Sequence, residues 1–330
     1  MNRKNYFLSL LISTLFLIFL FNCEKSEIPE DPLSLIPSDS FLLLHIKLKD
    51  ILNTETVKKM KETGEIPIDA FKDIKERLDI DPFQDIDSIA LALWSVNPPN
   101  GIALIKGNFN ERKIIETLKK EKVNTKEEKY KYFTIYSVEE ENNPFAFSFL
   151  NWHNILISSN AMNVKKSIDT TFVKKKERKN IYDNDTMKKL LLKLDFASQF
   201  YGSADMKPLI NAFPLLAQSE LISAIFSLKI DPNNNLISKI TIDCSGPTKA
   251  QELKTTFDQS LSQLSSNPMT APFYPILTNS IKTTLASNSF IMDINLTKDN
   301  LNQLVEMSKS LSPPATPKPQ ATPNTSSGNN

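Results

Sequence analysis

The chain has few side chains of the kinds that carry nucleophilic or metal chemistry: two cysteines and two histidines in 330 residues. Cys23 and Cys244 are far apart in sequence, and so are His45 and His153. A two-histidine metal site would need both histidines to meet in the fold, and a catalytic nucleophile would need one of them beside it. The spacing predicts neither arrangement, so we interpret both histidines as surface or structural residues.

Sequence motifs for catalysis are also missing. The six glycines form neither a G-x-G-x-x-G nor a P-loop spacing, so the sequence predicts no phosphate cradle of those kinds. There is no G-x-S-x-G elbow for a nucleophilic serine. Two carboxylates can converge from any part of a fold, but no pair stands out here. We therefore expect a non-catalytic protein without a cofactor, with an enzyme as the minority alternative.

The densest acidic segment runs from Asp79 to Asp87 and holds four aspartates in nine residues. Four carboxylates could bind calcium, yet the spacing lacks the glycine turn and the closing glutamate of an EF-hand. Asp81 precedes Pro82, a pair typical of a helix N-cap and first turn, and Asp85 or Asp87 could cap a turn. The segment is interpreted as capping, with a calcium site as the alternative, and no metal ligand is predicted.

The most specific chemical signal lies near the N-terminus. Arg3 and Lys4 precede fifteen residues, 7–21, that carry no charge. A basic start and a short apolar run are typical of a secretory signal peptide, whereas a bilayer-spanning helix needs roughly 20 apolar residues. An ordinary cleavage site has small residues at positions minus three and minus one, and Leu20 and Asn22 do not supply them.

The stretch from Leu20 to Cys23, read Leu-Phe-Asn-Cys, resembles the lipobox of bacterial lipoproteins, in the relaxed form found in spirochaetes. The resemblance implies that Cys23 receives a diacylglyceryl group, becomes the first mature residue and is acylated, for example with palmitate, on its new amino group. Two or three acyl chains give stable membrane anchoring. The expected protein is exported and lipid-anchored, at the outer membrane or the periplasmic face, or at the cell surface. An uncleaved anchor helix or a plain secreted protein is the alternative.

Cys244 is the other thiol, and a thioether at Cys23 would leave it without a disulfide partner. It ends the alternating segment 240–244, on the same face as Ile240 and Ile242. This position is typical of a small buried hydrophobic residue. A reactive thiol is the minority interpretation, because no histidine is near it in sequence.

The charge balance argues against one class of partner. The formal net charge is +1, and a near-neutral body does not favour nucleic acid, whose phosphates call for a basic face. One concentrated basic run, 174–179, is interpreted as part of a solvated linker, with contact to anionic lipid headgroups as an alternative.

The composition divides the chain into six segments. Residues 1–22 form the signal peptide, and residues 23–40, with three prolines, are expected to form an extended tether. Two structured halves are predicted at 41–173 and 185–311, joined by the basic linker 174–184. The last segment, 312–330, is rich in Pro, Thr and Ser and is expected to be a disordered tail.

Periodicity predicts the elements of both halves. Strands are expected over residues 41–48, 89–96, 102–106, 132–138, 145–152, 155–159, 199–204, 222–230, 236–244 and 290–296. Helices are expected over residues 51–62, 68–78, 111–120, 164–172, 207–218, 250–264 and 301–311. A strand, a helix, a hairpin and a second helix follow one another in each half, which suggests a duplication.

The predicted fold class is α+β, with two-layer antiparallel sheets and helices on one face, and the repeated order of elements suggests two related halves. The favoured function is a membrane-anchored envelope lipoprotein that acts as a non-catalytic binding or interaction module, with a protein among its possible partners. The alternative is a periplasm-facing carrier of lipid or another amphiphile, suggested by apolar runs such as 145–149 and 273–277. A large apolar cavity would favour the carrier, and a packed core would favour the interaction module.

Overall fold

The computed structural model describes residues 31–62, 75–76, 80–139, 144–172, 178–213 and 220–311. The chain divides into two compact units, residues 1–227 and 228–330, which are described separately. The predicted helix over 68–78 lies almost wholly outside the described residues, as do the signal peptide with Cys23, most of the basic run and the tail.

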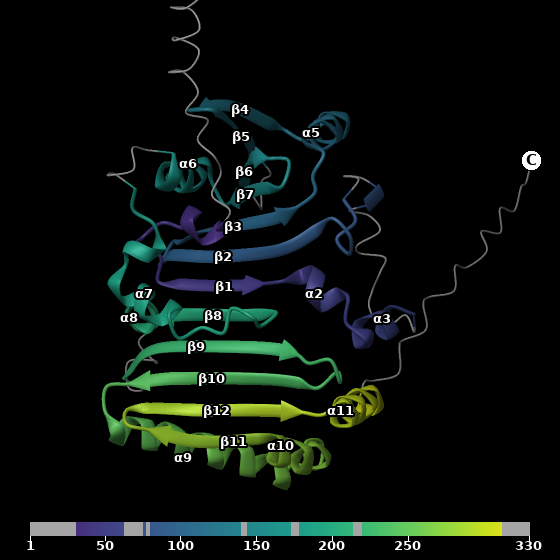
Figure 1. The fold of residues 1–330 in the computed structure, drawn as a ribbon, viewed down its shortest axis with the longest axis vertical. Helices are drawn as coiled ribbons and strands as arrows, with labels where there is room; N and C mark the ends of the chain where they lie inside the picture. Colours follow the sequence, from purple (N-terminus) through teal and green to yellow (C-terminus); the bar gives the residue numbers. More distant parts are fainter. Residues whose placement is uncertain are drawn as a thin grey trace, which may run out of the picture. The chain divides into compact units, whose positions relative to one another are not determined.

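The described strands pair into one antiparallel sheet of twelve strands, in the order β11-β12-β10-β9-β8-β1-β2-β3-β7-β6-β5-β4 (Figure 1). The α+β class with antiparallel pairing is therefore confirmed. Unit 1 holds β1 (Leu42–Ile46), β2 (Ile86–Val96), β3 (Pro99–Gly107), β4 (Thr125–Tyr130), β5 (Phe133–Val138), β6 (Phe145–Asn151), β7 (Asn154–Ser158), β8 (Phe200–Asp205) and most of β9 (Leu221–Ile230). Unit 2 holds the end of β9 with β10 (Leu236–Cys244), β11 (Ile281–Ala286) and β12 (Ser289–Leu296).

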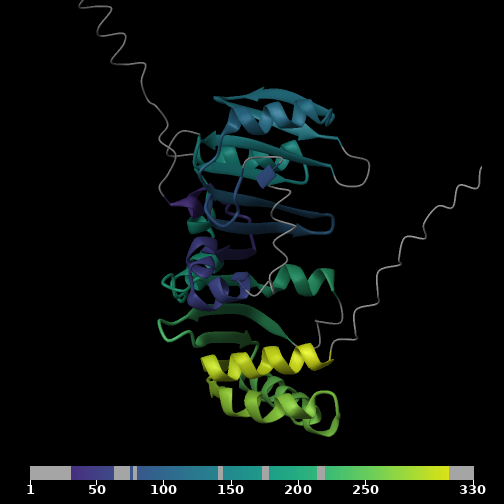
Figure 2. The same ribbon diagram turned by 90° about the vertical axis from the view of Figure 1, so that its right-hand side faces the viewer.

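Helices connect these strands. The helical segments of unit 1 are η1 (Pro32–Leu35), α2 (Leu48–Leu52), α3 (Glu55–Glu62), α5 (Glu111–Lys120), α6 (Ala161–Thr171), η3 (Ile181–Asp183), α7 (Asp185–Leu191) and α8 (Met206–Ala212). Those of unit 2 are α9 (Pro247–Ser266), η5 (Ala271–Phe273), α10 (Tyr274–Ser280) and α11 (Lys298–Leu311). Within unit 2, α9 contacts β10, β11 and β12, and α10 and α11 lie near it (Figure 2).

Side-chain oxygens fix several helix starts. Asn110 Oδ1 accepts a hydrogen bond from Lys113 N at 3.1 Å, and Asn160 Oδ1 accepts one from Asn163 N at 3.0 Å at the start of α6. Such caps satisfy amide groups that have no partner inside the helix. They also fix where each helix leaves the sheet.

Two apolar clusters cover opposite faces of the sheet around β5, β6 and β7. Leu156 packs with Ile168 of α6 on one face, and Phe147 packs with Ile114 of α5 on the other. Helices therefore cover both faces of this region, whereas the sequence predicted helices on one face. The buried run of β6 explains the difference, because a strand covered on both faces is apolar at consecutive positions.

The predicted tether over 23–40 is wrong for its last ten residues. Leu33, Leu35 and Ile36 are at most 3% exposed and belong to the core of unit 1. Three prolines suggested an extended chain, but η1 tolerates Pro32 at its start, where no amide proton is needed.

The predicted linker over 174–184 is wrong at its end, and the boundary of the second half is misplaced. Ile181 is fully buried in the core of unit 1, and Met187 of α7 joins it there. Strand β8, which was assigned to the second half, pairs with β1, with Gly202 opposite Leu44. The two compact units instead divide within β9.

Candidate functional site

The predicted lipidation residue, Cys23, lies outside the described residues. Cys244 is fully buried at the end of β10, and burial raises the pKa of its thiol. The prediction of a buried small hydrophobic residue is therefore confirmed for Cys244. His153 lies in the turn between β6 and β7, where its Nδ1 is 2.8 Å from the carbonyl oxygen of Gly107.

Within the acidic segment, Asp81 and Asp85 cap a turn, as the sequence predicted. Asp81 Oδ1 accepts a hydrogen bond from Phe83 N at 3.0 Å, and Asp85 Oδ2 accepts one from Asp81 N at 2.7 Å. The side-chain hydrogen bond from Lys75 to Asp81, 2.8 Å long, lowers the pKa of that carboxyl. Among the described residues, no cluster of three or more His, Cys, Asp or Glu side chains could hold a metal ion.

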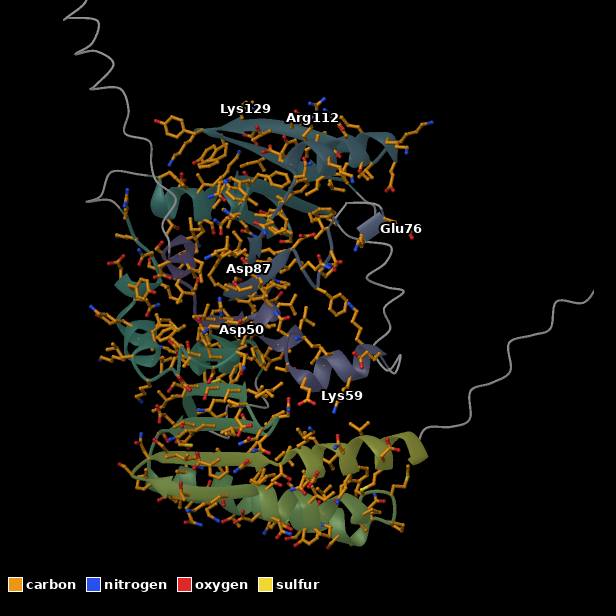
Figure 3. All side chains as sticks on the ribbon, turned by 45° about the vertical axis from the view of Figure 1, so that its right-hand side comes forward. Asp50, Lys59, Glu76, Asp87, Arg112 and Lys129 are labelled. Carbon is orange, nitrogen blue, oxygen red and sulfur yellow. The ribbon has the colours of Figure 1, made fainter. Side chains whose placement is uncertain are left out.

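A cavity of about 580 Å³ in unit 1 brings together residues that are distant in sequence. We call it the charged cavity, because three lysines and three aspartates line it. Its lining residues are Asp31, Pro32, Leu33, His45, Lys47, Lys49, Asp50, Asp87, Ser88, Lys106, Tyr182, Phe196 and Tyr201. Figure 3 labels Asp50 on α2 and Asp87 at the start of β2, two elements that contact each other.

Strand pairing positions the central residues of the charged cavity. In β1, His45 lies opposite Ala90 of β2 on one side and Tyr201 of β8 on the other. Alternation along the strand places Leu43 and His45 on one face, and both are buried. The alternation of apolar residues in the predicted strand 41–48 alone favours the opposite face, that of Leu42 and Leu44.

His45 is the most unusual side chain of the cavity. It is 5% exposed, and its ring stacks on Tyr201 with 4.8 Å between centroids and 19° between planes. Its buried Nδ1 makes no hydrogen bond within the described part of the chain. Burial, followed by the positive charge of Lys47, lowers the pKa of His45 from 6.5 to about 4. The imidazole is therefore neutral at pH 7.

Two tyrosines and one aspartate form the polar wall next to His45. Tyr182 donates a hydrogen bond of 2.5 Å to Asp31 Oδ2, while Asp31 Oδ1 caps η1 at Leu33 N. Burial first, then this hydrogen bond, raises the pKa of Tyr182. Burial also raises the pKa of Tyr201 to about 12. Both phenols therefore stay protonated at neutral pH, and the proton of Tyr182 is already donated to Asp31.

The lysines of the cavity differ in their contacts. Lys47 Nζ donates to the carbonyl oxygen of Phe196 at 2.8 Å, and Lys49 Nζ is 2.9 Å from Asp87 Oδ1. The exposed Lys106 makes no ion pair with the described side chains of the chain. Both Lys47 and Lys106 act to lower the pKa of His45, which shows that their charges reach the buried imidazole.

The sequence analysis missed this site as a whole. The predicted strand 41–48 contains His45 and Lys47, but nothing in it links them to Tyr182, Tyr201 or Lys106, which come from η3, β8 and β3. The sequence signal that could have indicated the charged cavity is the presence of polar and charged residues at the ends of the predicted strands. Only the pairing of β1 with both β2 and β8 brings them together.

No protein-family model and no curated protein matches the chain. The solved structure of crystal form IV of TP0453, a Treponema pallidum protein, is similar to 86% of this chain and 99% of its own, with a TM-score of 0.43 and 9% sequence identity. A likeness at this TM-score carries no argument about function. Among the described residues, no helix is long and apolar enough to cross a membrane.

Proposed function

We propose that the protein is an exported lipoprotein anchored to a membrane through acyl chains on Cys23, and that its folded body is a non-catalytic binding module. The charged cavity is its ligand site. The observation that carries this proposal is the buried, neutral His45, which lines a cavity and has a polar atom without a partner. Buried polar groups are normally paired, so such an exception marks a candidate functional position.

The ligand that fits the charged cavity is a small molecule with an anionic group, such as a carboxylate or a phosphate. Asp31 and Asp87 already accept bonds from Tyr182 and Lys49, so their charges are partly offset inside the protein. Lys106 keeps its charge available, and the protonated Tyr201 hydroxyl lies in the same lining. Ammonium and hydroxyl donors together suit an oxyanion.

The alternative of an amphiphile carrier receives less support from the fold. Phe147 and Phe149, which lie in the apolar run that suggested a carrier, are packed in the core beneath α5. The charged cavity is lined by six ionic side chains, whereas a lipid chain requires an apolar lining.

The test uses the two histidines as reporters in imidazole NMR spectra of the folded protein. Inorganic phosphate and succinate are titrated at constant ionic strength. We expect saturable shifts at His45 and none at His153, and a rise in the pKa of His45, because a bound anion favours the protonated ring.

The double variant Lys47→Gln/Lys106→Gln should lose this response, since it removes two of the cavity's cations. Lys126→Gln is the matched control, because it removes one exposed cation from β4, which contributes nothing to the cavity. Equal responses of the double variant and the control would refute the assignment of the charged cavity as the site.

A further inference from the structure

A second hollow in unit 1 carries two large exposed aromatic side chains. It has a volume of about 550 Å³ and shares no lining residue with the charged cavity. Tyr132, in the β4–β5 turn, is 83% exposed, and Trp152, in the β6–β7 turn, is 64% exposed. Both line this hollow, which we call the aromatic groove.

The turn that carries Tyr132 is fixed by contacts on its other side. Lys131 has a positive φ of 53° and pairs with Asp169 of α6 at 2.5 Å. Its Nζ also donates to the carbonyl oxygen of Phe172 at 3.1 Å, and Tyr130 donates a 2.7 Å hydrogen bond to Asp169. These bonds connect the turn to α6 and restrain the backbone that carries Tyr132.

The turn that carries Trp152 is fixed in the same way. Asn151 Oδ1 accepts hydrogen bonds from His153 N at 2.8 Å and from Asn154 Nδ2 at 3.1 Å. The carbonyl oxygen of Trp152 accepts a 2.9 Å bond from Phe109 N, and the His153 ring lies against the indole with centroids 3.3 Å apart. A rigid aromatic side chain loses little conformational entropy when it binds a ligand.

The rest of the groove combines aromatic and polar side chains. Phe109, Phe133, Phe149 and Leu150 are each less than 9% exposed, and Asn110, Glu111, Thr134 and Asn151 complete the lining. The side-chain oxygens of Asn110 and Asn151 are used within the protein. Their amide NH₂ groups make no hydrogen bond to any described group, so these donors remain for a ligand.

We propose that the aromatic groove binds a neutral carbohydrate chain. The C–H faces of a sugar ring pack against aromatic rings, and its hydroxyls suit the amide donors and the Glu111 carboxylate. Glu111 is the one charged residue in the lining, which disfavours an anionic ligand. A purely apolar partner would leave the groove's amides and carboxylate without hydrogen bonds. This site is independent of the charged cavity and of the anchor.

The experiment exploits the fact that the chain has two tryptophans, Trp94 and Trp152. In a Trp94→Phe background, fluorescence reports on Trp152, and the protein is titrated with chitohexaose, cellohexaose and maltohexaose. We expect a saturable change with at least one of them. Adding Tyr132→Ala should weaken the binding by about tenfold, the loss of one stacking partner.

Calorimetry measures binding in variants that lack the Trp152 fluorescence. Trp152→Ala should abolish the heat of binding of the sugar that changed the fluorescence. Leu192→Ala is the control, because Leu192 is also largely exposed (81%) but lies outside the groove. The variant Lys47→Gln/Lys106→Gln should bind the sugar normally, which separates this site from the charged cavity. The proposal would be overturned if none of the three sugars bound, or if Leu192→Ala and Trp152→Ala lost sugar binding equally. Binding of an apolar peptide in place of sugar would also overturn it.

Discussion

His45 shows how a residue acquires its properties from the strands beside it. In sequence it is a single polar residue within the apolar run 41–46. In the fold it stacks on Tyr201 and is nearly excluded from solvent. Desolvation of the charged form is the main reason for its lowered pKa. The sequence predicted a structural or surface role, and neither the stacking nor the unpartnered Nδ1 could be foreseen without the pairing of β1 with β8.

The lowered pKa of His45 makes stability depend on pH. The folded state binds this proton only near pH 4, whereas the unfolded chain binds it near pH 6.5, so the free energy of unfolding falls as pH drops between these values. Replacing His45 with Phe keeps a stacked ring and removes the proton. The difference in free energy of unfolding, variant minus parent, should be about 2 kcal/mol larger at pH 4.5 than at pH 7.5.

Urea denaturation at pH 7.5, 5.5 and 4.5 measures this gain. His153 is present in both proteins, so its contribution cancels. A difference between parent and variant that does not change with pH would show that His45 has an ordinary pKa.

At the scale of elements, apolar periodicity predicted most strands and helices, because most of them bury one face. It missed β4, whose sequence Thr-Lys-Glu-Glu-Lys-Tyr is charged and whose inner residues are exposed. Its place at the edge of the sheet explains this, since edge strands tolerate and even favour charged side chains. The predicted helix over 51–62 is instead two helices, α2 and α3, separated at Asn53 and Thr54.

The close contact of β8 with its neighbours predicts a specific weakness at Gly202. A Cβ atom there would lie 2.5 Å from the Phe226 ring and 2.7 Å from the carbonyl oxygen of Leu43. Backbone cannot yield easily, so Gly202→Ala should destabilise the protein by about 1 to 3 kcal/mol. Thermal or urea unfolding measures the loss.

Gly246→Ala is the control for this substitution. A Cβ at Gly246, the N-cap of α9, would meet no atom within 4 Å. Its cost should stay below about 1 kcal/mol, from the weaker capping preference of alanine. Similar costs at both glycines would refute the crowding argument for β8.

At the scale of the whole molecule, the suggested duplication stays a prediction. Moving outward from β1, the strands follow the order β2, β3, β7, β6, and moving outward from β8 they follow β9, β10, β12, β11. The last two strands of each series form a hairpin. A duplication would produce this shared strand order, and β4 and β5 would then be an addition to the first series. Sequence patterns suggested the repeat but placed its boundary by composition, whereas in the sheet the two series meet where β1 pairs with β8.

Cys23 lies outside the described residues, but a lipid anchor there would determine where the binding sites act. Only the seven residues 24–30 separate Cys23 from Asp31, which lines the charged cavity. Even fully extended, these residues span about 30 Å at most. An acylated Cys23 would therefore keep the charged cavity close to the membrane surface.

The lipid anchor at Cys23 is tested by the mass of the protein purified from its own membrane and measured intact under denaturing conditions. The lipoprotein proposal predicts a mass equal to residues 23–330 plus one diacylglyceryl group, with or without a third acyl group on the new amino group. It also predicts that a Cys23→Ala variant carries no lipid and is released from the membrane fraction. A mass that includes residues 1–22, or a Cys23 that carries no acyl group, would contradict it.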